Sequence, residues 1–312
     1  MPIDPDLAKY LADVAAEIPP LSMPAPPDAR RARMEAVARR FAFPEDEVER
    51  RDHWLHLAGR ELLVRIYRPG PGRLPAIVYL HGGGWVAGSV ASHDGACATL
   101  ASDANAVVAS VQYRRAPENP FPAPNDDAFA ALQWLARSAR DLCVDESSIG
   151  IAGDSAGAHL ALGAAIEARD RGGPGLAMQL LIYPVVAPDF ETASYLEHAV
   201  SPTLSRADMI EYWNHYLPGR ASDGDRRALP FRDALRGLPP ALVVVAGLDP
   251  LHDEGVALAR RLEEAQGSVR LADEPTLAHG FMRAAPFCGR ARSATRAFGQ
   301  AAGEALRRAG KR

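Results

Sequence analysis

A serine flanked by glycines, in the order Gly153-Asp154-Ser155-Ala156-Gly157, separates a short apolar segment from a run of small residues. The segment before it, 148–152, has the character of a buried strand, and the residues after it, 158–166, favour a helix. A turn this tight needs glycine-like residues two positions before and two positions after the serine. A Gly-X-Ser-X-Gly pattern also arises by chance at glycine-rich helix starts. The strand and helix around it nevertheless favour a nucleophile elbow with Ser155 at its tip.

The rest of the chain alternates between expected strands and expected helices. Continuous apolar strands separated by amphipathic helices are typical of a parallel sheet that is covered on both faces. The first two strands are separated only by Ala58-Gly59-Arg60, which predicts an antiparallel hairpin. We therefore expect an α/β fold with an eight-stranded, mostly parallel sheet and helices on both faces. The expected strands are 49–57, 61–67, 75–80, 106–111, 148–152, 177–183, 241–246 and 268–273. The expected core helices are 92–104, 125–140, 156–171, 252–266 and 290–309.

Two segments break this alternation and predict a helical cap. The first precedes the sheet and has helical patterns at 5–17 and 28–41, separated by a proline-rich stretch, 18–27, that excludes a regular helix. The second lies between the sixth and seventh expected strands and has a helical pattern at 205–217. An insertion there belongs at the carboxyl ends of the strands, where open α/β sheets bind ligands. The predicted divisions are a cap arm at 1–48, a first core part at 49–185, a cap insertion at 186–228 and a second core part at 229–312.

Three consecutive glycines follow the expected strand 75–80, within the sequence HGGGW at 81–85. Glycines let the backbone approach a substrate closely, and acyl transfer needs two or three N–H donors aimed at the developing oxyanion. The residue after the nucleophile would add a donor from the other side. A flexible loop or a phosphate-binding loop are the alternatives, but the latter requires Lys-Ser or Lys-Thr after the glycines, and Trp85-Val86 follow instead. The candidate oxyanion donors are the N–H groups of Gly82, Gly83, Gly84 and Ala156.

An aspartate and a histidine follow the last two expected strands. Asp249 comes shortly after strand 241–246, and His279 follows the last strand. Because the carboxyl ends of parallel strands meet at one edge of a sheet, we expect both side chains near Ser155. The chain order serine, aspartate, histidine is also the one that a nucleophile elbow of this kind favours. Asp253 is the rival acid, but it falls one turn later and suits the beginning of a helix.

Composition argues against several other functions. The net charge is −4, so no strong positive field attracts nucleic acid or anionic lipid. The three cysteines are widely spaced, which favours neither a disulfide framework nor a zinc site and suits a reducing compartment. No apolar stretch is long enough to span a membrane, and the first residues do not resemble a signal peptide. We therefore expect a cytoplasmic protein that uses no metal and no organic cofactor.

These motifs resemble the hormone-sensitive lipase family of esterases, including its bacterial carboxylesterases. The similarity rests on HGGGW (81–85), YRRAPENPFPAP (113–124), GDSAG (153–157), DPLHDEG (249–255) and AHGF (278–281). The resemblance implies an α/β-hydrolase core under a helical cap built from the N-terminus and the insertion after the sixth strand. It also implies Ser155, Asp249 and His279 as a catalytic triad and Gly83, Gly84 and Ala156 as oxyanion donors, with Gly82 left open. Arg115 and Ala158 depart from the family pattern, which usually has an apolar residue and a glycine there.

The predicted activity is hydrolysis of short- to medium-chain carboxylic esters through an acyl-enzyme. Trp85, Tyr183, Trp213 and Phe281 are candidate walls of an apolar substrate cleft, although Tyr183 and Trp213 suit a packed core equally well. An amidase or arylformamidase on the same fold is the first alternative. A non-catalytic small-molecule receptor is the second, and the presence of His279 disfavours it. The expected partner is a small-molecule ester, with no nucleic acid and no stable membrane insertion, and a homodimer is left open.

Overall fold

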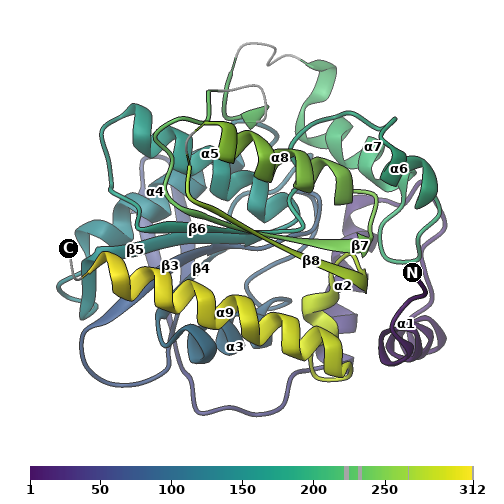
Figure 1. The fold of residues 1–312 in the computed structure, drawn as a ribbon, viewed down its shortest axis with the longest axis horizontal. Helices are drawn as coiled ribbons and strands as arrows, with labels where there is room; N and C mark the ends of the chain where they lie inside the picture. Colours follow the sequence, from purple (N-terminus) through teal and green to yellow (C-terminus); the bar gives the residue numbers. More distant parts are fainter. Residues whose placement is uncertain (221–224, 231–233, 266, 311–312) are drawn as a thin grey trace.

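One eight-stranded sheet crosses the molecule in the computed structural model, which describes residues 1–220, 225–230, 234–265 and 267–310 (Figure 1). The strands are β1 (Glu49–Leu57), β2 (Arg60–Arg68), β3 (Leu74–Leu80), β4 (Val107–Val111), β5 (Val144–Asp154), β6 (Met178–Ile182), β7 (Ala241–Leu248) and β8 (Val269–Ala278). Their order is β1-β2-β4-β3-β5-β6-β7-β8. The pairs β1–β2 and β2–β4 are antiparallel and the others are parallel. The predicted eight-stranded, mostly parallel sheet is confirmed.

Strand pairing explains where the observed boundaries differ from the predicted ones. Strand β5 begins at Val144, earlier than expected, because Val144 pairs with Leu74 ahead of a register shift between β3 and β5. Strand β8 continues to Ala278 because that residue pairs with Leu248 at the end of β7. The turn between β1 and β2 contains Gly59 at a φ of 74°, a left-handed conformation that favours glycine.

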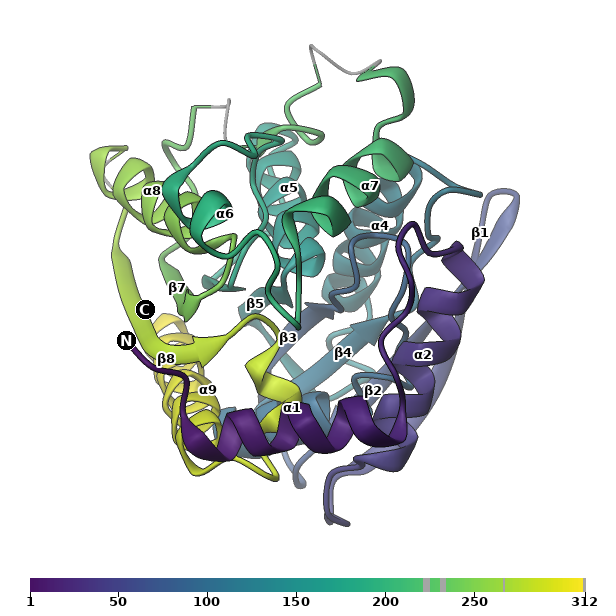
Figure 2. The same ribbon diagram turned by 90° about the vertical axis from the view of Figure 1, so that its right-hand side faces the viewer.

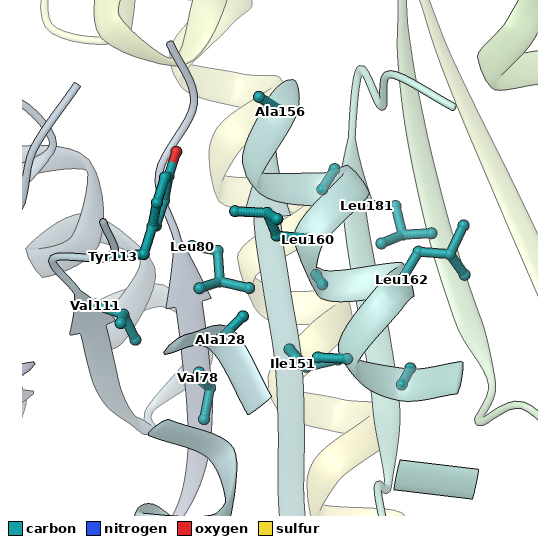
Figure 3. Packing of buried hydrophobic residues seen from close by; sticks show 14 of the residues in the cluster. Val78, Leu80, Val111, Tyr113, Ala128, Ile151, Ala156, Leu160, Leu162 and Leu181 are labelled. Atoms are coloured by element: carbon teal, nitrogen blue, oxygen red, sulfur yellow. The ribbon is translucent and has the colours of Figure 1, made fainter. Parts of the chain in front are cut away.

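Helices cover both faces of the sheet. Those of the core are α3 (Asp94–Ala104), α4 (Ala123–Arg137), α5 (Ala156–Asp170), α8 (His252–Glu264) and α9 (Gly289–Ala309). Helices α3 and α9 lie on one face, and α4, α5 and α8 lie on the other (Figure 1). Successive residues of β3 alternate between these two cores: Ile77 belongs to one, and Val78 and Leu80 to the other. Leu80 packs beside Leu160 of α5 (Figure 3).

Further helices gather at the end of the molecule toward which the parallel strands run (Figures 1 and 2). They are α1 (Pro5–Glu17), α2 (Pro27–Arg40), α6 (Ala193–Glu197) and α7 (Arg206–Tyr216). The two segments predicted as cap pieces meet here, because Arg30 of α2 bonds to Asp208 at 2.9 Å and to Glu211 at 2.6 Å, both on α7. The short helix α6, capped by Thr192, was not predicted from the sequence. None of the helices described is both long and apolar enough to cross a membrane.

Candidate active site

The predicted elbow is present between β5 and α5. Ser155 has a φ of 55° and a ψ of −122°, a strained conformation that exposes its hydroxyl at the tip of the turn. No side chain fits at the two glycines that flank the serine. A Cβ on Gly157 would lie 1.9 Å from the carbonyl oxygen of Leu80, and one on Gly153 would lie 2.3 Å from the backbone of Gly157. The sequence pattern is therefore a steric consequence of how closely the turn packs against β3.

Three side chains from three different strand ends meet at this elbow. Nε2 of His279 lies 3.0 Å from Oγ of Ser155, and Nδ1 of the same ring lies 2.7 Å from Oδ2 of Asp249. The other carboxylate oxygen of Asp249 accepts the backbone N–H of Leu251 at 2.9 Å, which fixes the carboxylate's orientation. Asp249 is fully buried, whereas Ser155 and His279 are 6% and 8% exposed, and His279 lines a cleft.

The rival acid Asp253 and two other histidines of this region, His252 and His159, lie elsewhere. Asp253 sits in the first turn of α8, where its carboxylate accepts the backbone N–H of Ser194 at 2.9 Å. His252 is 3.1 Å from Asp253 and not in contact with the elbow. His159 points away from Ser155 and lies 3.0 Å from the carbonyl oxygen of Ala228. Among the residues that the structure describes, no group of three or more His, Cys, Asp or Glu side chains is arranged to hold a metal ion.

The glycine loop presents backbone donors beside the elbow. Gly83 and Gly84 have φ values of 122° and 61°, which orient their N–H groups in a way that other residues rarely allow. Within the described ranges, the N–H groups of Gly83, Gly84 and Ala156 have no protein acceptor. The N–H of Gly82 is different, because it donates to Oδ1 of Asp154 at 2.8 Å. The inclusion of Gly82 among the candidate oxyanion donors is therefore corrected: its N–H is already engaged.

Asp154 is the functional residue that sequence reasoning missed. Its carboxylate accepts the Tyr79 hydroxyl at 2.7 Å as well as the N–H of Gly82, and Nε2 of His93 lies 3.5 Å away. Burial alone would raise the pKa of Asp154, but His93, the Tyr79 hydrogen bond and Arg283 hold it well below its ordinary value. A buried carboxylate thus anchors the glycine loop to the elbow. The sequence signal that could have identified Asp154 is an aspartate at the end of an apolar strand, because a buried carboxylate needs hydrogen-bond partners.

The aromatic residues proposed as cleft walls divide into two groups. Trp85 is fully buried and stacks on Tyr216 with ring centroids 4.3 Å apart, and Trp213 packs against the same Trp85 ring at 4.7 Å. Both tryptophan rings are buried in one aromatic cluster, so their assignment to the substrate cleft is wrong. Tyr183 is also buried, behind His279, with ring centroids 4.7 Å apart. Phe281 does line the cleft.

The cleft beside His279 has a volume of about 510 Å³. Helices α1, α2 and α7 and the segment 200–205 form its walls. The residues of α7 that face it are Asp208 and Tyr212, the second of which is the neighbour of Trp213 on the helix. Its apolar lining includes Leu7, Leu11, Val14, Met34, Leu204 and Phe281. A cleft with a large apolar lining that reaches His279 suits a small organic substrate.

Known proteins share this arrangement of fold and sequence. Residues 77–283 match a family described by the α/β-hydrolase fold. The chain belongs to the α/β-hydrolase family. It is 43% identical over 229 residues to carboxylesterase NlhH of Mycobacterium tuberculosis, covering 71% of this chain and 72% of that protein. It is 37% identical over 298 residues to an ethyl acetate hydrolase of Pseudomonas putida, covering 91% and 93%. The crystal structure of a thermostable esterase from Pseudomonas putida superposes with a TM-score of 0.90 at 30% identity, over 96% of this chain and 97% of that one.

Membership in this family confirms the predicted resemblance to the hormone-sensitive lipase esterases and the predicted class, carboxylic ester hydrolases.

The two departures from the family pattern lie outside the Ser155–His279–Asp249 contact. Arg115 donates to the carbonyl oxygen of Gly88 at 2.7 Å and so holds the loop that follows the glycines. Ala158 is fully buried in the first turn of α5.

Proposed function

We propose that this α/β-hydrolase is a serine carboxylesterase in which Ser155 is the nucleophile, His279 the general base and acid, and Asp249 the residue that orients His279. The observation that carries the proposal is the pair of contacts on one imidazole ring, 3.0 Å to Ser155 and 2.7 Å to Asp249. A serine hydroxyl is a weak nucleophile until an adjacent base takes its proton. A ring held between hydroxyl and carboxylate has the tautomer that can do so.

In the acylation step, the Ser155 oxygen attacks the ester carbonyl carbon while its proton moves to Nε2 of His279. The carbonyl electron pair shifts to oxygen, and a tetrahedral intermediate forms. The buried carboxylate of Asp249 stabilises the imidazolium without taking its proton. When the intermediate collapses, the bond to the alcohol oxygen breaks. That oxygen receives the proton from Nε2, and the acyl group stays on Ser155.

Deacylation repeats these steps with water. His279 takes a proton from a water molecule, whose oxygen attacks the acyl carbon, and the carboxylic acid leaves as Ser155 regains its proton. In both intermediates the negative oxygen needs preorganised donors. The N–H groups of Gly83, Gly84 and Ala156 are the proposed donors, because each lacks a protein acceptor within the described residues.

We further propose short- to medium-chain esters as the substrates. A cleft of about 510 Å³ with apolar walls accommodates a small acyl or alcohol group rather than a long lipid chain. The relative named ethyl acetate hydrolase supports the same size range. Hydrolysis of p-nitrophenyl esters of increasing chain length tests this, with Ser155→Ala in parallel. The expected result is a maximum at short or medium chains and loss of turnover in Ser155→Ala. Faster hydrolysis of long-chain esters would overturn the size assignment.

A further inference from the structure

Two arginines line the substrate cleft without a carboxylate partner. They are Arg33 of α2 and Arg283 of the short 3-10 helix η3 (Phe281–Ala284), which directly follows His279 and Gly280. The guanidinium of Arg33 donates only to backbone carbonyls, those of Pro19 at 3.1 Å and Ile18 at 3.3 Å, within the residues described. For Arg283, the described part of the chain supplies neither a hydrogen-bond acceptor nor an ion-pair partner to the side chain.

The acidic groups around them are already engaged. Asp208, which also lines the cleft, is bound by Arg30 at 2.9 Å, and Arg30 bonds to Glu211 as well. Asp46 and Asp94 share a small cavity with Arg283, but both bond to Arg50. Asp154 attracts Arg283 electrostatically, but its Oδ1 accepts from Gly82 and Tyr79, and its Oδ2 accepts the Tyr183 hydroxyl at 3.5 Å. The cleft therefore carries excess positive charge beside the reactive serine and histidine.

The two arginines also disfavour each other. Partial burial lowers the pKa of Arg33, and the positive charge of Arg283 lowers it further. Two half-buried guanidinium groups that face one cleft destabilise the folded protein unless an anion binds to them. Guanidinium groups bind carboxylates through paired, parallel hydrogen bonds.

We propose that this cleft selects esters that carry a free carboxylate, with Arg283 as the main specificity residue and Arg33 as its partner. The inference rests on the proposed esterase function and names its substrate class. The carboxylate would sit at the arginines while the ester carbonyl reaches Ser155, and an aliphatic linker would lie along the apolar wall formed by Leu7, Leu11 and Phe281. Two kinds of molecule present this chemistry: half-esters of dicarboxylic acids, and esters whose alcohol part bears the acid.

The test compares matched charged and neutral esters on the same enzyme preparation. Monoethyl adipate and ethyl hexanoate differ by a carboxylate on the acyl side. The anion of 4-acetoxybutanoic acid and butyl acetate differ by one on the alcohol side. Acid release at constant pH gives kcat/KM for each. The wild type is expected to favour the charged member of at least one pair by about tenfold or more in kcat/KM. The reason is that the substrate carboxylate exchanges its contacts with water for hydrogen bonds to a guanidinium group. The responding pair identifies which side of the ester faces the arginines.

Variants separate this role from a structural one. In Arg283→Met, the loss in kcat/KM should be about tenfold greater for the charged ester than for the neutral one, mainly through KM. Arg33→Met should show the same selective loss to a smaller degree, and Arg283→Lys should retain part of the preference. Arg39→Met, an exposed arginine on the same helix as Arg33, is the matched control and should change neither ester.

Two results would overturn the inference: no preference for either charged ester in the wild type, or an equal loss on charged and neutral esters in Arg283→Met. If a folded wild type hydrolyses none of the four esters, the proposed esterase function itself fails, and the inference fails with it.

Discussion

Oδ1 of Asp154 accepts the backbone N–H of Gly82 at 2.8 Å and the hydroxyl of Tyr79 at 2.7 Å. One buried carboxylate thus joins the residue directly before the nucleophile to the first glycine of the loop that presents the proposed oxyanion donors. The distance between Ser155 and those donors depends on this contact. Asp154 is accordingly a positioning residue, because it touches the loop and not the reacting atoms.

Replacing Asp154 by alanine should lower kcat about tenfold to a hundredfold with a smaller change in KM. The glycine loop would be displaced, and its N–H donors would then stabilise the transition state less well while substrate binding changes little. The substitution also leaves two buried donors without an acceptor, which should lower the free energy of unfolding by about 1–3 kcal/mol each. Steady-state kinetics and urea unfolding measure both effects. Asp154→Asn keeps an acceptor oxygen and should lose less activity. An unchanged kcat in folded Asp154→Ala would contradict this role.

The steric need for glycine in the loop gives a second prediction. A Cβ at Gly84 would lie 2.3 Å from the ring of Tyr212, so Gly84→Ala must shift the loop or α7 and should reduce kcat about tenfold or more. Gly59 has a similar positive φ, 74°, but a Cβ added there would meet no atom within 4 Å, which makes Gly59→Ala the matched control. That variant should lose about 1 kcal/mol of stability and keep its kcat. Equal activity of the two variants would rule out the steric explanation.

Acid should destabilise the fold through buried His159. Burial lowers its pKa to about 4 from an ordinary value of 6.5. Between these values the unfolded chain binds a proton that the folded protein does not, so stability is present at neutral pH and is lost as the pH falls below about 6.5. The slope from this residue approaches about 1.4 kcal/mol per pH unit. Urea unfolding from pH 7 to pH 4.5 should show a flatter dependence in His159→Gln than in the wild type. Parallel curves would mean that His159 is not responsible.

The contact between the two cap segments predicts an effect on substrate binding. Arg30→Met would leave Asp208 and Glu211 without their shared cation and would also remove a hydrogen bond, 3.1 Å long, to the Tyr212 hydroxyl in the cleft. We expect KM for a hexanoate ester to rise several-fold with less change in kcat, and limited proteolysis of α2 or α7 to become faster. Arg40→Met removes an exposed pair with Glu17 and should do neither. Unchanged KM and proteolysis in Arg30→Met would contradict a structural link between the cap segments.

The sequence predicted those parts of the site that depend on strand ends. Ser155, Asp249 and His279 each follow a parallel strand, and the geometry of such a sheet brings strand ends together. The walls of the cleft could not be predicted in the same way. Trp213 and Tyr212 are neighbours on α7, and which of them faces the cleft depends on how that helix rotates against Trp85.

The partners of Asp154 could not be predicted from the sequence either. Its partners, Tyr79 and Gly82, are more than seventy positions away along the chain, and only the pairing of β3 with β5 brings them together. Burial of an aspartate at a strand end predicts that partners exist, but not which residues they are. Arg283 was also not singled out, since its lack of a carboxylate partner becomes visible only when the surrounding side chains are placed.

The most direct test of the account is covalent trapping of the nucleophile. A p-nitrophenyl alkylphosphonate should release one equivalent of p-nitrophenol per active site and leave a stable phosphonyl group on the peptide that contains Ser155, identified by mass spectrometry after proteolysis. Ser155→Ala should show neither the burst nor the adduct. His279→Gln should react far more slowly, because the serine loses its base. An adduct on another residue, or equal labelling of Ser155→Ala, would contradict the assignment of Ser155 as the nucleophile.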